Sequence, residues 1–252
     1  MRPAWILVLI VGCASAGRDT FGGGTGDSGI DSSTTLVDAA VPMDAPLPMI
    51  DAPPGMVTVT LQQTTNNTVV AANSVACGGC NNTSNPCNST YTAENAYYRV
   101  FALADHGITN PFNVSQVTFG VQEAAGTQTV QVKIGTYAGT PGTTLNTGAT
   151  DFAGAITPIN TATVSVPATT TGISVPAPIT ATVPAGSNLI VAVFSPTHQG
   201  QANTYFYIGA TNAGETKPGY MRAPNCSLST ATTTGGVGYP AANLLISVTG
   251  SH

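Results

Sequence analysis

From Met56 onward the apolar residues of the 252-residue chain recur at every second position. The segments 57–61, 117–121 and 130–134 each alternate Val, Leu, Ile or Phe with a small or polar residue. Such alternation puts successive side chains on opposite faces of a β-strand, so that one face is buried and the other meets water. Residues 189–194 are apolar at every position, which is typical of a short strand that is covered on both faces or lies at the centre of a sandwich.

Turn signals separate these segments. Breakers that contain Gly occur at 138–142, 184–187 and 234–236. Further strands are expected at 96–103, 164–166, 179–183, 205–210 and 243–249. No window of helical length shows an amphipathic stripe. Roughly nine or ten short strands between turns predict an all-β domain of two packed antiparallel sheets, with a jelly-roll-like sandwich as first choice and an immunoglobulin-like sandwich as the alternative.

The N-terminus predicts export. Arg2 precedes an apolar run that ends in Ile-Val-Gly-Cys at residues 10–13. This form is typical of a signal peptide, and the run is shorter than the roughly 20 residues of a membrane-spanning helix. The last four residues resemble the bacterial lipobox, which implies a lipoprotein signal peptide over 1–12 and a diacylglycerol on Cys13, with palmitate-type chains. The alternative is ordinary cleavage after Ala16, which would release a secreted protein.

Two further observations favour the anchored form. The chain has five cysteines, and assigning Cys13 to the lipid leaves four that can pair. Ala14 follows Cys13, whereas in the enteric sorting rule an Asp at that position favours the inner membrane. Several acyl chains together make anchoring in a bilayer stable. We therefore expect an exported protein that is lipid-anchored in the cell envelope, with the outer membrane as the predicted location.

Residues 13–55 have the composition of a spacer. They are rich in Gly, then in Asp and Ser, and then contain Asp-Ala-Pro units at 44–46 and 51–53. Such a segment buries too little apolar area to offset the entropy lost on ordering. We expect a disordered linker that reaches between about 35 and 130 Å. Calcium binding by its Asp residues is the weaker alternative, because their spacing is not that of a calcium loop.

The net charge of −5 belongs largely to the predicted linker, because most of the Asp residues precede residue 56. The predicted domain, 56–252, is almost neutral. Its charged residues are Glu94, Asp105, Glu123, Asp151 and Glu215 against Arg99, Lys133, Lys217 and Arg222. This balance leaves no basic face to neutralise phosphates, so nucleic acid is excluded as a partner.

Residues that could carry catalysis are few. Asp105 and His106 are adjacent and a Gly follows, so an exposed loop pair is the favoured interpretation over an acid–base pair. Glu94 and Glu123 are single carboxylates in different expected strands. The chain contains no G-x-S-x-G, H-E-x-x-H or paired-histidine metal motif. We therefore expect no enzyme, with no catalytic residues, no metal and no cofactor.

A binding module is the favoured class of function, because the loops or a concave face of a sandwich can hold a ligand. The only Trp, Trp5, lies in the signal peptide, so the eight Tyr residues are the candidates for stacking on a sugar ring. In alternating strands, however, Tyr more often packs in the core. We expect an extracellular glycan or protein as the partner. A structural or adhesive envelope protein is the alternative, and an accessory domain of a secreted hydrolase is a weaker one; the ligand-binding residues and the oligomeric state stay open.

Three segments carry a likeness to a known kind of domain. They are 94–103, 117–121 and 207–212, with Pro218-Gly219-Tyr220 and Cys226 downstream. Together they resemble a poorly characterised, jelly-roll-like β-sandwich module of exported bacterial proteins, here carried by a surface lipoprotein. The resemblance spans most of residues 57–250. It implies a fold and a compartment rather than an activity.

The remaining cysteines are Cys77, Cys80, Cys87 and Cys226. The C-x-x-C pair is followed by a polar loop rather than a helix, which argues against a redox pair. Cys226 stands alone, whereas a four-cysteine zinc site usually has two close pairs. Export therefore favours disulfides, with three connectivities open. The resemblance implies Cys77–Cys226, which leaves Cys80–Cys87 to close the short polar loop.

Overall fold

A computed structural model of the chain describes residues 55–79, 91–148, 150–201 and 203–252. The predicted signal peptide, Cys13 and the predicted linker up to residue 54 lie outside these described residues, as do Cys80 and Cys87. All described residues except Gly55 belong to one compact unit, Met56–His252. None of the helices in these residues is long and apolar enough to cross a membrane.

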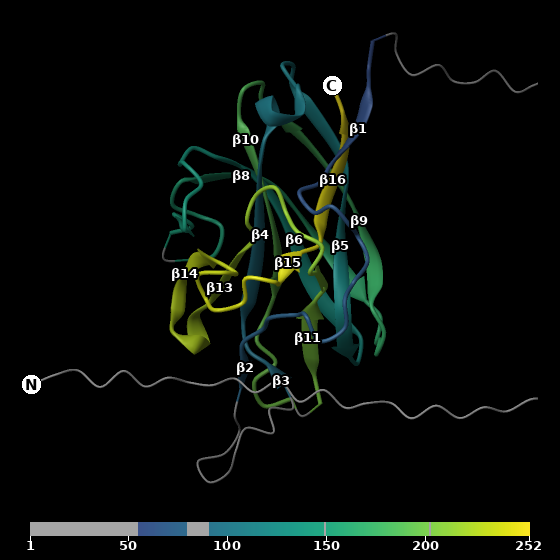
Figure 1. Cartoon of the computed structure of the whole chain (residues 1–252), viewed down its shortest axis with the longest axis vertical. Coiled ribbons are helices and arrows are strands. Elements are labelled where there is room, and N and C mark those ends of the chain that lie inside the picture. Colours follow the sequence, from purple (N-terminus) through teal and green to yellow (C-terminus); the bar gives the residue numbers. More distant parts are fainter. Residues whose placement is uncertain (1–54, 80–90, 149, 202) are drawn as a thin grey trace, which may run out of the picture. The chain divides into compact units, whose positions relative to one another are not determined.

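The domain is a sandwich of two antiparallel sheets, as predicted (Figure 1). One sheet has five strands: β1 (Thr58–Leu61), β16 (Ile246–Ser251), β5 (Phe112–Ala125), β11 (Tyr205–Ile208) and, on the other side of β5, β9 (Ile173–Val183). The other has seven, in the order β7 (Thr144–Leu145), β14 (Leu228–Thr233), β13 (Tyr220–Ala223), β4 (Asn95–Ala102), β10 (Asn188–Ser195), β6 (Gln128–Tyr137) and β8 (Ile156–Val166).

Shorter elements complete the described fold. They are the strand pairs β2 (Gly78–Gly79) with β3 (Tyr91–Thr92) and β12 (Ala210–Thr211) with β15 (Asn243–Leu244), and the 3₁₀ helices η1 (Leu103–His106) and η2 (Pro224–Cys226). The chain passes repeatedly between the two large sheets, since β4, β6 and β10 lie in one and β5, β9 and β16 in the other. This connectivity fits the jelly-roll-like prediction.

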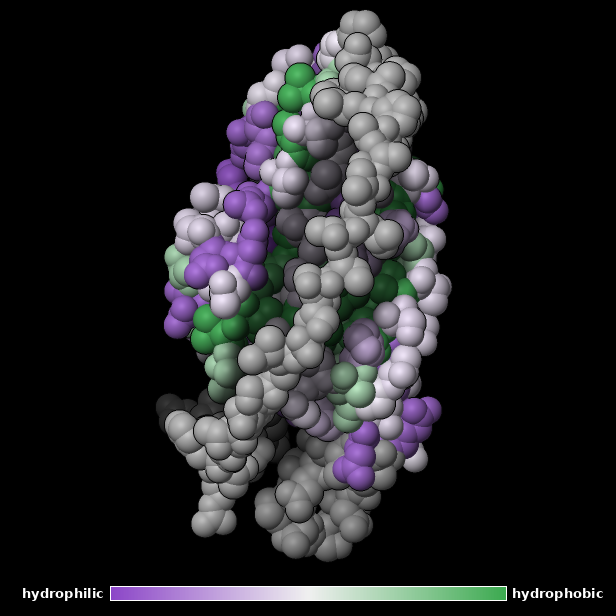
Figure 2. All heavy atoms as spheres, turned by 90° about the vertical axis from the view of Figure 1, so that its right-hand side faces the viewer, coloured by the Kyte–Doolittle hydropathy of each residue, from purple (hydrophilic) through white to green (hydrophobic). Residues whose placement is uncertain are grey.

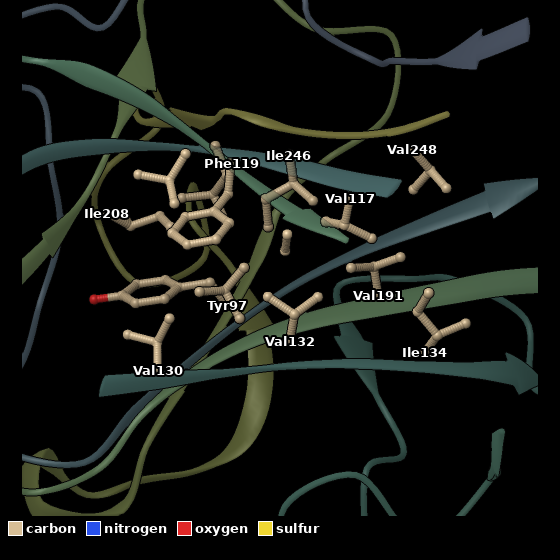
Figure 3. Packing of buried hydrophobic residues seen from close by; sticks show 14 of the residues in the cluster. Tyr97, Val117, Phe119, Val130, Val132, Ile134, Val191, Ile208, Ile246 and Val248 are labelled. Carbon is tan, nitrogen blue, oxygen red and sulfur yellow. The ribbon is translucent and has the colours of Figure 1, made fainter. Parts of the chain in front are cut away.

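The main core lies between the two sheets and consists of the inward residues of the alternating strands. Val117 and Phe119 of β5 face Val130 and Val132 of β6, and all four are fully buried (Figure 3). β10 lies between β4 and β6 at the middle of the seven-stranded sheet. Burying each large apolar side chain stabilises the fold by about 1.5–3 kcal/mol, because the side chain is removed from water. This gain drives the two sheets together.

A second apolar cluster covers the outer face of the seven-stranded sheet. Tyr98, Ile190 and Tyr220 point to this side and pack with Leu145 and Phe152, which belong to the long connection between β6 and β8. Within 189–194 of β10, the even-numbered residues therefore pack in this cluster while the odd-numbered residues belong to the main core. The prediction that 189–194 form a strand covered on both faces is thus confirmed.

On the opposite side of the sandwich, the outer face of β9 has no charged residue. The outward residues of β9 are Ser174, Pro176, Pro178, Thr180 and Thr182, all exposed. Figure 2, viewed from the side of β9, shows described residues that are pale to purple along both margins, with hydrophobic residues mainly between them. Hydroxyl side chains, rather than charges, therefore keep the outer face of β9 hydrated.

Several strand boundaries differ from the prediction, and the expected strand 243–249 is divided at Leu245 into β15 and β16. β8 and β9 begin well before 164 and 179, because Pro158, Pro176 and Pro178 obscure the alternation. β9 pairs with β5 on one side only, and an edge strand tolerates residues that lack an N–H. The segment 96–103 ends one residue early because Leu103 begins η1. Gly209 divides 205–210 into β11 and β12.

Candidate functional site

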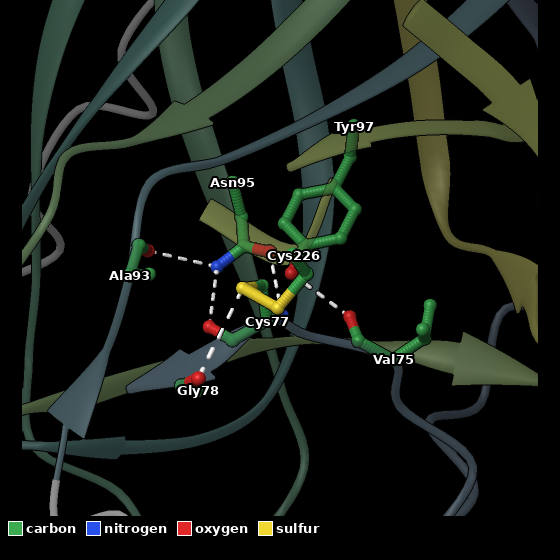
Figure 4. The surroundings of a disulfide bond; sticks show 7 residues. All are labelled: Val75, Cys77, Gly78, Ala93, Asn95, Tyr97 and Cys226. Carbon is green, nitrogen blue, oxygen red and sulfur yellow. Dashed lines mark hydrogen bonds between the residues drawn. A yellow bond between two sulfur atoms is a disulfide. The ribbon is translucent and has the colours of Figure 1, made fainter. Parts of the chain in front are cut away.

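The predicted disulfide Cys77–Cys226 is present and joins residues 149 positions apart (Figure 4). Asn95 holds the backbone of Cys77 from both sides: its Oδ1 accepts from the Cys77 N–H at 2.7 Å, and its Nδ2 donates to the Cys77 carbonyl at 3.1 Å. The buried Tyr97 hydroxyl donates to the Val75 carbonyl at 2.9 Å. This surrounding network marks a structural bond that fixes the segment before β2 to η2, which follows β13.

Arg99 of β4 is a fully buried charge that faces the main core. Its Nη2 lies 2.7 Å from Glu215 Oε2 and donates to the Leu244 carbonyl, also at 2.7 Å, while Nη1 donates to the Lys217 carbonyl. Desolvation lowers the pKa of Arg99, and the Glu215 carboxylate opposes that shift. The arrangement ties β4 to β15 and to the segment that follows β12.

The segments 117–121 and 207–212 lie side by side in the structure. Gly209 donates its N–H to the Gly120 carbonyl at 2.8 Å, and Leu245 donates to the Gly209 carbonyl at 3.0 Å. A Cβ at Gly209 would lie 2.7 Å from the carbonyl carbon of Gly120, so the close approach of the strands requires glycine. Close packing thus accounts for the glycines at positions 120 and 209.

A charged cluster on the outer face of the seven-stranded sheet resembles catalytic machinery. Asp151 forms an ion pair with Lys133 and accepts a hydrogen bond from the Tyr98 hydroxyl. The Lys133 ammonium lies 4.4 Å from the centroid of the Phe194 ring. Burial, followed by the charge of Asp151, raises the pKa of Tyr98 far above its usual value, so the phenol stays protonated. Lys133 and Tyr98 both interact with Asp151, and these contacts hold the β6–β8 connection against the sheet.

The acid–base candidates of the sequence do not assemble into a catalytic site. Asp105 and His106 lie in η1 rather than in a loop, and Asp105 forms an exposed ion pair with Lys217 at 3.2 Å. Glu94 directly precedes β4, rather than lying within a strand, and its Oε1 lies 2.8 Å from Arg222 Nη1. Among the described residues, no group of three or more His, Cys, Asp and Glu side chains could hold a metal ion.

Burial sorts the eight tyrosines into two groups. Five are buried: Tyr91, Tyr97, Tyr98, Tyr137 and Tyr220. Of the partly exposed remainder, Tyr239 packs against the main core. This leaves Tyr205 and Tyr207 of β11, where Phe206 and Ile208 between and beside them point inward. The Tyr-Phe-Tyr-Ile sequence already contained this alternation, although it could not show that the outer face stays uncovered.

Tyr205, Tyr207 and Glu123 form what we call the tyrosine–glutamate patch. The two ring centroids lie 5.3 Å apart with an interplanar angle of 46°. Glu123 of β5 is the register partner of Tyr207, and its Oε1 accepts a 2.6 Å hydrogen bond from the Tyr205 hydroxyl. That bond, with some burial, raises the pKa of Tyr205 to about 12. Burial and the Glu123 charge raise the pKa of Tyr207 as well.

His198 lies buried near the same end of the domain. Its Nδ1 is 3.4 Å from the Thr92 hydroxyl oxygen, which in turn accepts a hydrogen bond from the Phe206 N–H at 3.1 Å. The backbone N–H of His198 donates to the Thr92 carbonyl at 3.0 Å. Burial lowers the pKa of His198 and so favours the neutral imidazole, which contacts β3 at Thr92 and is linked to β11 through that residue.

Comparisons with known proteins add little to this geometry. No protein-family model and no curated protein matches the chain. One solved structure is similar: the cysteine protease and lectin-like domains of Cwp84, a surface layer associated protein of Clostridium difficile. The similarity covers 63% of this chain at 13% sequence identity, with a TM-score of 0.42. The matched region is 32% of the chain of that protein. A likeness at this level has no bearing on activity or ligand.

Proposed function

We propose that this chain is an exported lipoprotein, anchored in the outer membrane through acylated Cys13, whose β-sandwich is a non-catalytic module that binds an extracellular glycan. The lipobox-like residues 10–13 and the spacer composition of 13–55 support the anchored form. The tyrosine–glutamate patch supports the binding role, because aromatic rings beside a hydrogen-bond acceptor suit the apolar face and the hydroxyls of a sugar.

The position of the patch on the domain agrees with this role. Val57, where the domain begins, exchanges backbone hydrogen bonds of 3.0 and 3.2 Å with His252, beside the Asn113 end of β5. Tyr205 pairs with Ala125 at the other end of β5, and Figure 1 shows β11 at the opposite end of the sandwich from β1. Twelve residues of strand separate Asn113 from Ala125, or about 40 Å. A domain tethered through its N-terminal side can therefore present the patch away from the membrane.

The observation that carries the proposal is that Tyr205 and Tyr207 are paired, outward and partly exposed, unlike the five buried tyrosines. The test is a glycan array probed with the full chain carrying Cys13→Ser, which removes the lipid. We expect binding that the double change Tyr205→Ala, Tyr207→Ala abolishes, because the stacking surface is gone.

The matched control is Tyr205→Phe with Tyr207→Phe, which keeps both rings and removes only the hydroxyls. It should retain part of the binding. If the wild-type chain binds no glycan, and deletion of the protein weakens cell-envelope integrity, the structural envelope role replaces this proposal.

A further inference from the structure

Each Lys and Arg side chain of the described domain forms an ion pair with a different carboxylate, which leaves one carboxylate over. The pairs are Arg99 with Glu215, Lys133 with Asp151, Lys217 with Asp105 and Arg222 with Glu94. Glu123 is the remaining acidic side chain, and it has no Lys or Arg partner within the described ranges. Its one hydrogen-bond donor there is the neutral hydroxyl of Tyr205. A carboxylate charge therefore stands uncompensated on the surface, beside two aromatic rings.

The rings add to the attraction for a cation. The face of a Tyr ring carries the negative part of its quadrupole, and an ammonium group within about 6 Å of the centroid is attracted to it. Because the rings of Tyr205 and Tyr207 are inclined by 46°, they present two faces at an angle rather than one flat platform. The hydrogen bond from Tyr205 occupies only Oε1 of Glu123 and leaves further acceptor capacity on the carboxylate.

We propose that the tyrosine–glutamate patch recognises a glycan that carries a free ammonium group, that is, a deacetylated amino sugar. The sugar ring packs against Tyr205 and Tyr207, and the ammonium group donates to Glu123. This proposal rests on the glycan-binding function proposed above and names the class of sugar. An N-acetylated sugar offers the same ring, but its neutral amide leaves the Glu123 charge without a counterion while removing water from it.

The experiment is titration calorimetry of the full chain carrying Cys13→Ser with a glucosamine oligomer and with its N-acetylated counterpart of equal length. The buffer is mildly acidic, so that the amines are protonated, and low in salt, because screening weakens exposed charge interactions. We expect the glucosamine oligomer to bind and the N-acetylated oligomer to bind much more weakly. Glu123→Gln should lower the affinity for the glucosamine oligomer by about tenfold or more.

The matched control is Asp105→Asn, which removes the same charge from the exposed pair with Lys217 and should change the affinity little. Circular dichroism checks that both variants are folded. Equal affinity for the two oligomers, or no effect of Glu123→Gln, overturns the amino-sugar inference while the proposed glycan binding stands. Failure of both oligomers to bind overturns the inference alone when other glycans on the array bind. When none binds, the proposed function fails as well.

Discussion

Glu215→Gln tests the buried ion pair that joins β4 to the segment before β13. Arg99 has no exposed surface, and the Glu215 side chain is 18% exposed. Removing one partner of a buried pair leaves an uncompensated charge and costs about 3–5 kcal/mol. Water reaches Glu215, so we expect the lower end, about 3 kcal/mol, which is a large part of the 5–15 kcal/mol that typically stabilises a domain. Urea unfolding followed by circular dichroism measures the change as a lower midpoint at unchanged slope.

Arg99→Met completes a double-mutant cycle with Glu215→Gln. It removes the charge itself and takes a hydrogen-bond donor away from the carbonyls of Leu244 and Lys217, which we expect to cost about 2–4 kcal/mol. Once Arg99 is absent, Glu215→Gln has no buried charge to leave unpaired and should cost almost nothing more. The double variant should therefore be about as stable as Arg99→Met. The reasoning would be refuted if the losses of unfolding free energy in the two single variants simply added in the double variant. It would also be refuted if Glu215→Gln alone cost less than about 1 kcal/mol.

Three other predictions concern the anchor, the disulfide and His198. Labelling of cells with an alkyne fatty acid should mark the wild-type chain and not Cys13→Ser; equal labelling, or an N-terminus at Gly17, contradicts lipidation. Cys226→Ser opens a bond that closes 149 residues and should cost up to about 5 kcal/mol, more than Cys87→Ser, because the predicted Cys80–Cys87 bond closes only a short loop. Because folding lowers the pKa of His198, this residue takes up a proton more readily in the unfolded chain, so stability should fall as the pH drops below about 6.5. His198→Gln should reduce this loss of stability at low pH, and His106→Gln should reduce it less.

The strands that are easiest to predict from the sequence are those whose two faces differ most in polarity. β5 and β6 alternate Val, Ile and Phe with polar residues, because one face meets the core. β9 was recognised only over its last residues, although Val175 and Ala177 alternate just as strictly with exposed positions. The exposed positions there are Pro176 and Pro178, and a local rule reads proline as a strand breaker, whereas an unpaired strand edge accepts it.

Contacts between distant segments were harder to predict. The Cys77–Cys226 bond followed from the family resemblance, not from spacing, since three connectivities were open. The cluster of Lys133, Asp151 and Tyr98 was missed, because it forms only when the β6–β8 connection folds over the outer face of the sheet. No local signal in the sequence marks that covering segment as part of a second apolar cluster.

The tyrosine–glutamate patch shows where composition stops being informative. With five acidic and four basic residues in the domain, pairing each basic side chain once leaves one carboxylate over, but the sequence does not say which one. Because only a tight turn separates β5 from β6, the sequence alone would suggest an ion pair between Glu123 and Lys133. Those two strands lie in different sheets, however, and Lys133 points to the outer face of the seven-stranded sheet, where it meets Asp151. Because the chain changes sheets at that turn, the negative charge of Glu123 is left beside Tyr205 and Tyr207 rather than neutralised.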